Sequence, residues 1–307
     1  MADTNQEHIF DDVFRTLEEH TPELMIPLIN EVFHTDYPED TVVTKLSDKH
    51  HLLLKLLETD SYLGIEDKVY HFECESNPNT GVIAIRMFQY DVTVALERKQ
   101  KISGSYIVEF PESCVIYLRH KKSTKEKEQV IIRLADGQEF TYRVPVIKSQ
   151  RFSKEELFEK KLYVLFPYYI LKYEKELPEF EEEEEKRLQL LGEYEDICQR
   201  LKDTLGVENP LTYQELLDSM RHMLEYILRE YTEIKEGAQQ IMGGKVLESW
   251  QEKTLRQGRE QGREELLISL VETKIAKGKS VAVIAEELEK DISEIQLIYD
   301  KLISTGE

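Results

Sequence analysis

Acidic side chains gather on one face of a short segment, residues 58–76, which reads ETDSYLGIEDKVYHFECES. Two runs rich in β-branched, aromatic and other apolar residues flank the charged residues 66–68, and this pattern predicts a β-hairpin. Because successive side chains on a strand point to opposite faces, His71, Glu73 and Glu75 share one face. The opposite face is apolar and belongs in a core. The face with the carboxylates is therefore the one that could form a functional site.

The length of the hairpin loop decides which carboxylates meet. A two-residue loop at residues 66–67 sets Asp60 opposite Glu73 and Glu58 opposite Glu75. Paired Cβ atoms lie roughly 5 Å apart, so three or four carboxylates would crowd one patch. A three-residue loop would shift the register by half a step and place Glu73 diagonal to Asp60.

Carboxylates this close repel one another unless one of them binds a proton or a cation lies between them. A hard divalent ion with oxygen ligands, Mg²⁺ or Mn²⁺, relieves this repulsion best. The pattern therefore predicts a metal site made by Asp60, Glu73, Glu75 and Glu58. The alternative is a solvated strand face whose charges keep a sheet edge soluble.

Several segments together resemble one known family. These segments are TDSYLGI, VYHFECES and IRMFQYDVTVALE, followed by FPESCVIYLRH, DGQEFTYRVPVIK, KKLYVLFPYYILKYEKEL and a Gly-Arg-Glu repeat near the C-terminus. They are similar to the PD-(D/E)XK nuclease superfamily, specifically the Rpn-type recombination-promoting nucleases and putative transposases of bacteria. The resemblance implies an α/β, restriction-endonuclease-like core with a mixed central sheet flanked by helices, followed by an all-α region.

The resemblance also implies roles for individual residues. Asp60 would be the strand aspartate that binds metal, and Glu73 would be the second metal-binding acid. Glu75 stands where the superfamily has a lysine and where Rpn-type proteins usually have glutamine, so it would act as a metal ligand or a base. Superfamily members often add an acid from the first helix, which makes Glu31 a candidate ligand or, alternatively, a surface glutamate.

A helix is expected directly after the hairpin, from about residue 82 to residue 98. Arg86, Gln89 and Tyr90 occupy its more polar side, and we expect them near the carboxylates. Arg86 could hold a scissile phosphate or steady the acids, the alternative being a surface salt bridge. The apolar side is expected to face the core, with Val82, Ile85, Phe88, Val92, Ala95 and Leu96.

The chain divides into three regions by composition. Residues 1–175 alternate helix and strand patterns and form the nuclease-like domain. Residues 176–240 consist of helix-forming residues, and residues 241–307 contain a QGRE repeat and a short two-helix tail. The repeat places Gly258 and Gly262 on one helical face, which suggests a self-association arm and thus a possible homo-oligomer; the alternative is a polar linker.

Charge and cysteine content limit the classes of function. The net charge of −21 is unusual for a nucleic-acid-binding protein, but residues 101–175 carry 15 basic and 10 acidic side chains. Only this middle third could face phosphates. Three widely spaced cysteines favour neither a disulfide framework nor a zinc site. No run of about 20 apolar residues spans a bilayer, so we expect a cytoplasmic protein without a membrane segment.

These features favour a metal-dependent DNA endonuclease that hydrolyses phosphodiesters. The first alternative is a catalytically weakened or inactive nuclease scaffold that binds DNA or mediates assembly, which the missing lysine and the acidic surface favour. The second is a helical interaction protein whose function resides in residues 176–307. The choice of DNA over RNA follows from the resemblance alone.

Overall fold

The computed structural model describes residues 8–46, 49–52, 55–58, 61–77, 82–243 and parts of 267–299. For residues 49–52 and 55–58 only the main chain is described. Residues 1–244 form one compact unit and residues 245–307 form a second. The elements that carry the acidic hairpin all belong to the first unit.

A six-stranded mixed sheet lies at the centre of this unit, in the order β1-β4-β5-β8-β10-β9. The strands β5 (Lys68–Glu75), β8 (Glu112–Tyr117) and β10 (Glu139–Lys148) run parallel to one another. The outer strands β1 (Thr44–Lys45), β4 (Ser61–Ile65) and β9 (Lys127–Arg133) are antiparallel to their neighbours. The expected α/β class with a mixed sheet is therefore confirmed.

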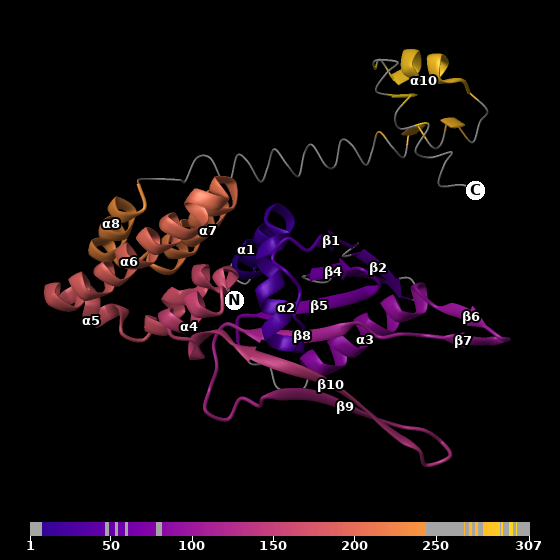
Figure 1. The fold of residues 1–307 in the computed structure, drawn as a ribbon, viewed down its shortest axis with the longest axis horizontal. Coiled ribbons are helices and arrows are strands. Elements are labelled where there is room, and N and C mark those ends of the chain that lie inside the picture. The colour runs from indigo at the N-terminus through magenta and orange to yellow at the C-terminus, as the bar shows by residue number, and fades with distance from the viewer. Residues whose placement is uncertain are drawn as a thin grey trace. The chain divides into compact units, whose positions relative to one another are not determined.

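Helices cover both faces of this sheet (Figure 1). On one face, α1 (His8–His20) and α2 (Met25–Phe33) pack on the apolar side of β4 and β5. On the other face lies α3 (Val82–Glu97), whose Ile83 and Met87 pack on Val115 and Tyr117 of β8. Because strand residues alternate between faces, His71 and Glu73 point towards α3, as the hairpin pattern predicts.

The orientation of α3 differs from the expected one. Val82, Ile85 and Leu96 are exposed, whereas Tyr90, Asp91 and Thr93 are buried against the sheet. The expected core face is thus only partly correct: Ala95 is buried, but Val82, Ile85 and Leu96 are not, because hydrophobic spacing alone assigns a buried carboxylate to the solvent side. Asp91 is tolerated in the interior because hydrogen-bond donors surround it, as described below.

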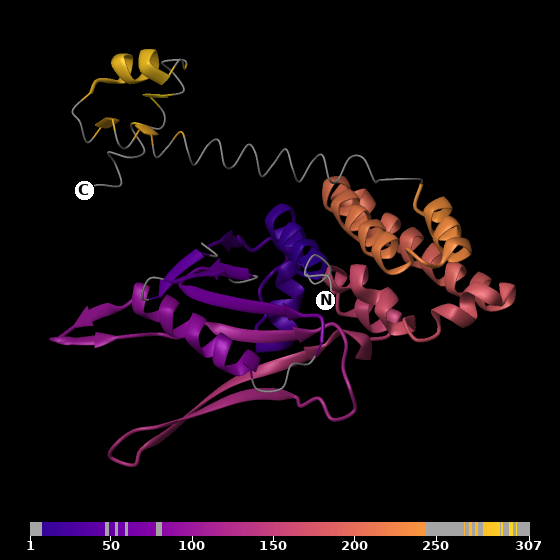
Figure 2. The same ribbon diagram turned by 180° about the vertical axis from the view of Figure 1, so that it is seen from behind.

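Two β-hairpins extend beyond the sheet (Figure 2). One is formed by β9 and β10, which turn at Asp136-Gly137 as the sequence predicts, with Gly137 at a φ of 88°. The other is formed by β6 (Gln100–Ile102) and β7 (Ser105–Ile107), which pair only with each other in a separate two-stranded sheet. These two strands therefore do not extend the central sheet.

Helices continue the first unit after β10. These are α4 (Lys154–Glu159), a 3₁₀ helix (Tyr163–Tyr173), α5 (Leu177–Glu182), α6 (Glu184–Glu208), α7 (Pro210–Ile227) and α8 (Thr232–Ile241). The tyrosine-rich run is buried, and its residues share one apolar core with α1, α2, α6 and α7. Ser153 and Glu156 form a capping box at the start of α4. The Asn209 side chain accepts the Thr212 N–H and so caps α7, which begins at Pro210.

The second unit has a small core of its own, made by Val271, Ile284, Ala285 and Ile295, with α10 (Val281–Leu288) as its described helix. The QGRE repeat with Gly258 and Gly262 lies outside the described residues. Among the helices that are described, none combines the length and the apolar composition needed to cross a bilayer.

Candidate functional site

The acidic hairpin has the two-residue loop expected from its sequence. Ile65 pairs with Lys68, and Ser61 pairs with Phe72. Glu73 is buried on β5 and Glu75 is half-buried at the end of the same strand. The two carboxylates therefore occupy successive positions on one face of a central strand, where the sheet holds them rigidly.

Of the two acids expected opposite Glu73 and Glu75, Glu58 lies elsewhere in the structure and Asp60 is not described. Glu58 does not lie opposite Glu75, because residues 55–58 form β3 (Lys55–Glu58), which pairs with β2 (Lys49–Leu52), and Glu58 faces Lys49 there. That pairing closes a much shorter loop than one with β5, which lowers its entropic penalty. Asp60 lies outside the described residues, so its role as a ligand stays a prediction.

One guanidinium joins the two carboxylates. Arg86 Nη2 on the first turns of α3 donates to Glu73 Oε2 at 2.9 Å and also to Glu75 Oε1. Its side chain remains 39 % exposed, whereas that of Glu73 is only 3 % exposed. A positive charge that reaches solvent thus lies between two acids on the sheet, as the position of Arg86 on the helix predicts.

A buried polar network supports Glu73 from behind. His71 Nε2 lies 3.4 Å from Glu73 Oε1, and its Nδ1 lies 2.6 Å from Asp91 Oδ1 on α3. Asp91 also accepts hydrogen bonds from Ser113 at 2.5 Å, from Tyr62 at 3.2 Å and from Tyr142. With four donors directed at it, the fully buried Asp91 carboxylate is well compensated.

Both ring nitrogens of His71 face carboxylate oxygens, so a doubly protonated imidazolium can donate on both sides. Burial lowers the pKa of His71, but the charge and hydrogen bond of Asp91, aided by Glu73, reverse this effect and raise it to about 9. The ring also stacks on Tyr62, with centroids 4.2 Å apart and an angle of 16° between the planes. His71 is therefore held as a fixed cation between Asp91 and Glu73.

This protonation has a consequence for stability. A histidine whose pKa is raised on folding stabilises the fold fully below its unfolded pKa of about 6.5, and this contribution is lost as pH rises through the folded value. We therefore expect the unfolding free energy of the wild type to fall between pH 6.5 and pH 9 by more than that of His71→Gln. Urea denaturation at several pH values measures both slopes, and parallel slopes would contradict a charged His71.

The structure adds a carboxylate that the sequence did not single out. Burial raises the pKa of Asp11 on α1 to about 7; Arg15 lowers it, and Glu75 and Glu73 raise it further. The negative charges of both acids on β5 therefore act on the Asp11 carboxyl. The acid expected from the N-terminal helices is Glu31 on α2; Asp11 on α1 is a different residue, and nothing in the sequence distinguishes it from Asp12 beside it.

The remaining predicted residues lie in different surroundings. Tyr90 is buried on α3, with its ring 6.0 Å from that of His71, so it belongs to the wall of the site. Gln89 is exposed, on the side of α3 that faces away from the buried Asp91. Glu31 on α2 accepts both of its 2.8 Å hydrogen bonds from Lys160 Nζ, which supports its alternative reading as a surface glutamate.

The donor set of the site suits a hard cation. Glu73 and Glu75, the two carboxylates that Arg86 joins, offer oxygen donors alone, and oxygen is what Mg²⁺ and Mn²⁺ prefer. Arg86 already places a positive charge between Glu73 and Glu75, which marks the position where a cation is stabilised. Among the side chains that the structure describes, no cluster of three His, Cys, Asp or Glu reaches ligand geometry, and Asp60 is outside that set.

Comparisons with protein-family models, with curated proteins and with solved structures found no match for this chain.

Proposed function

We propose that this protein is a metal-dependent DNA endonuclease that hydrolyses phosphodiester bonds at the carboxyl end of β5. The observation that carries the proposal is the pair of carboxylates Glu73 and Glu75, joined by the partly exposed Arg86, with Asp11 close enough for their charges to raise its pKa. The fold class agrees with it, since a mixed sheet with helices on both faces holds these residues. The choice of phosphodiester hydrolysis as the reaction and of DNA as the substrate follows from the resemblance of the hairpin segments to Rpn-type nucleases.

Each side chain has a distinct task in this proposal. Glu73, Glu75 and Asp11 would hold one Mg²⁺ or Mn²⁺, together with Asp60. The bound ion supplies a low-pKa water and stabilises charge on the phosphate. His71 keeps Glu73 Oε1 oriented, because Asp91 fixes its ring. Arg86 can turn from the two acids to a phosphate oxygen, since its guanidinium already reaches solvent.

A second candidate is a scaffold of the same fold that binds DNA without cleaving it. The Arg86 bridge favours this candidate, because a guanidinium that satisfies Glu73 and Glu75 competes with a metal ion for the same oxygens. The two candidates differ in one property: an active enzyme must release this bridge when a divalent cation binds. Cleavage is therefore the measurement that separates them.

We expect the full chain to nick supercoiled plasmid in Mg²⁺ or Mn²⁺ and to be inactive in EDTA, and Asp60→Ala to abolish nicking. Asp67→Ala is the matched control, since Asp67 is an exposed carboxylate in the turn of the same hairpin. Cleavage that survives Asp60→Ala would contradict the proposed ligand set. A folded wild type that binds duplex DNA but never nicks it would favour the scaffold.

A further inference from the structure

The hairpin β6–β7 and the two residues before it carry a net positive charge. Residues 98–107 read RKQKISGSYI and contain three basic residues and no acidic one, in a protein whose net charge is −21. Every residue of both strands is exposed. We call this element the basic arm, and Figure 1 shows that it projects beyond the sheet. Because both strands are exposed, the basic arm adds no residue of theirs to the core. Its positive charge suits a negatively charged binding partner.

The shape of the basic arm is encoded by its turn. Ser103 and Gly104 both have positive φ angles, 50° and 87°, as a two-residue type I′ turn requires. Cross-strand pairing puts Lys101 beside Tyr106, with the ammonium 5.8 Å from the ring centroid. Ile102 and Ile107 lie on the opposite side and are 49 % and 44 % exposed. Both faces of this narrow ribbon are therefore open.

The basic arm is connected to the candidate site through α3. It follows α3 directly, and α3 carries Arg86 near its start. Eleven residues separate Arg86 from Glu97, a distance of about 17 Å at 1.5 Å per helical residue. Base pairs in a duplex are spaced by about 3.4 Å, so this length corresponds to roughly five base pairs. A duplex that lies along α3 would reach both places.

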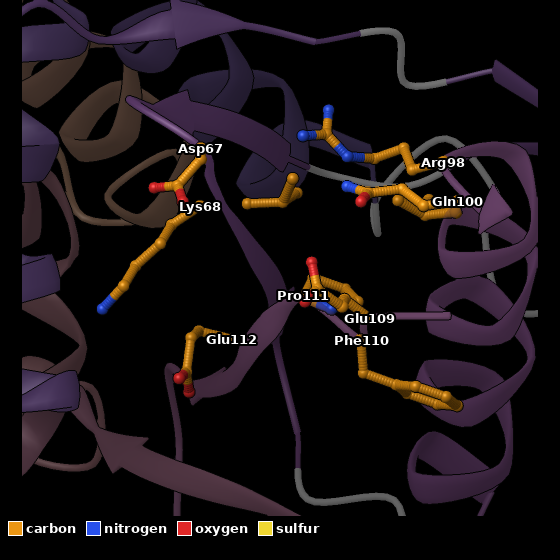
Figure 3. A pocket seen from close by; sticks show the side chains of 10 residues that line it. Asp67, Lys68, Arg98, Gln100, Glu109, Phe110, Pro111 and Glu112 are labelled. Atoms are coloured by element: carbon orange, nitrogen blue, oxygen red, sulfur yellow. The ribbon is translucent and has the colours of Figure 1, made fainter. Parts of the chain in front are cut away.

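A pocket at the base of the basic arm does not suit phosphate. Its volume is about 650 Å³, and it is lined by Asp67, Glu109 and Glu112 as well as by Lys68 and Arg98. Figure 3 shows Arg98 on the opposite side of this pocket from Glu112. The acids there would repel a phosphate, and Arg98 lines the same pocket. On the basic arm, the basic side chains that do not line this pocket are Lys99 and Lys101, and these two could bind a polyanion.

We propose that the basic arm inserts into the major groove of duplex DNA, with Lys99 and Lys101 on backbone phosphates about five base pairs from the cleaved bond. The major groove is about 12 Å wide and admits a two-stranded β-ribbon. Insertion explains why both faces of the ribbon are exposed, because both would meet groove walls. The proposal rests on the proposed function for its choice of DNA as substrate.

A second copy of this chain is the competing partner. In a twofold-symmetric contact the same patch meets itself, so two basic arms would bring Lys101 close to Lys101 of the other copy. Like charges directly opposite one another destabilise such a contact. Polyanionic DNA has the complementary charge, and we therefore favour it over self-association.

The test measures binding without cleavage. The full-length protein is titrated in EDTA against a fluorescent 20-base-pair DNA duplex by anisotropy, at salt concentrations from 25 to 200 mM. Each lysine–phosphate contact contributes about 0.9 to the slope of log K against log salt. Lys99→Gln/Lys101→Gln should therefore flatten the slope by about 1.8. Tyr106→Ala should weaken binding several-fold at every salt concentration without changing the slope.

The matched control is Lys172→Gln/Lys202→Gln, which removes the same charge from exposed lysines outside the basic arm. Like Lys99 Nζ, Lys172 Nζ donates to a main-chain carbonyl, so the two double variants lose similar contacts. The control should keep the wild-type slope. Equal slopes for the wild type and the arm variant, or no duplex binding by the wild type, would overturn the proposal.

Further measurements distinguish failure of groove insertion from self-association of the arm and from failure of the endonuclease proposal. Duplex RNA has a deep, narrow major groove that the ribbon cannot enter, so an equal slope change with RNA would overturn groove insertion. A change of mass by light scattering in the arm variant, with DNA binding unaltered, would assign the arm to self-association. Arm-dependent binding by a wild type that never nicks plasmid would support the arm and refute the endonuclease.

Discussion

Replacing Glu73 by glutamine is expected to lower metal-dependent nicking by about 10³-fold while the protein stays folded. Glu73 is the buried acid of β5 that contacts both Arg86 and His71. A metal ligand at this position contributes about 4 kcal/mol of transition-state stabilisation, which corresponds to that factor. Glutamine keeps the shape and one oxygen of the side chain but removes its charge. Initial nicking rates in Mg²⁺ and Mn²⁺ measure the loss.

Glu193→Gln is the control for this substitution. Glu193 is also a carboxylate engaged by two donors, the hydroxyls of Tyr169 and Tyr173, but it lies on α6 in the helical part of the unit. It should nick plasmid at the wild-type rate. A Glu73→Gln protein that retains a tenth or more of the wild-type rate would show that this acid does not bind the catalytic ion.

Asp91→Ala is expected to produce the largest loss of stability, about 3–5 kcal/mol, because it leaves a buried positive charge without its partner. His71 would keep only the longer contact to Glu73, and the hydroxyls of Ser113 and Tyr142 would lose their acceptor. Urea denaturation at pH 7 measures the change.

Asp203→Ala provides the comparison. Asp203 is exposed on α6 and accepts a single side-chain hydrogen bond from Gln199, so its removal should change stability by no more than about 0.5 kcal/mol. An Asp91→Ala protein that loses less than about 1 kcal/mol would mean that His71 is neutral in the folded state.

The sequence predicted the part of the site that depends on local pairing. Alternation of polar and apolar residues placed Glu73 and Glu75 on one face of a strand, and the two-residue loop fixed the register of Ile65 and Lys68. The same reasoning failed at Glu58, because the chain forms a separate hairpin before β4 begins. Register can be extrapolated only as far as a strand continues.

The buried side of α3 could not be read from hydrophobic spacing. That face includes Asp91, and its burial depends on donors from β4, β8 and β10, which are far apart in the sequence. Asp11 was missed for a similar reason. An acid on the first helix becomes special only when the fold brings it near Glu73 and Glu75. Tertiary contacts, which no local pattern encodes, decide both cases.

The most direct test of the cation site is a calorimetric titration of Mn²⁺ into the wild type and into Glu73→Gln. The titration should be made at pH 8, because Asp11, with a pKa of about 7, must lose its proton to act as a ligand. We expect saturable binding to the wild type and at least a tenfold weaker affinity for the variant. Equal affinities, or no binding to the wild type, would contradict a metal site formed by these carboxylates.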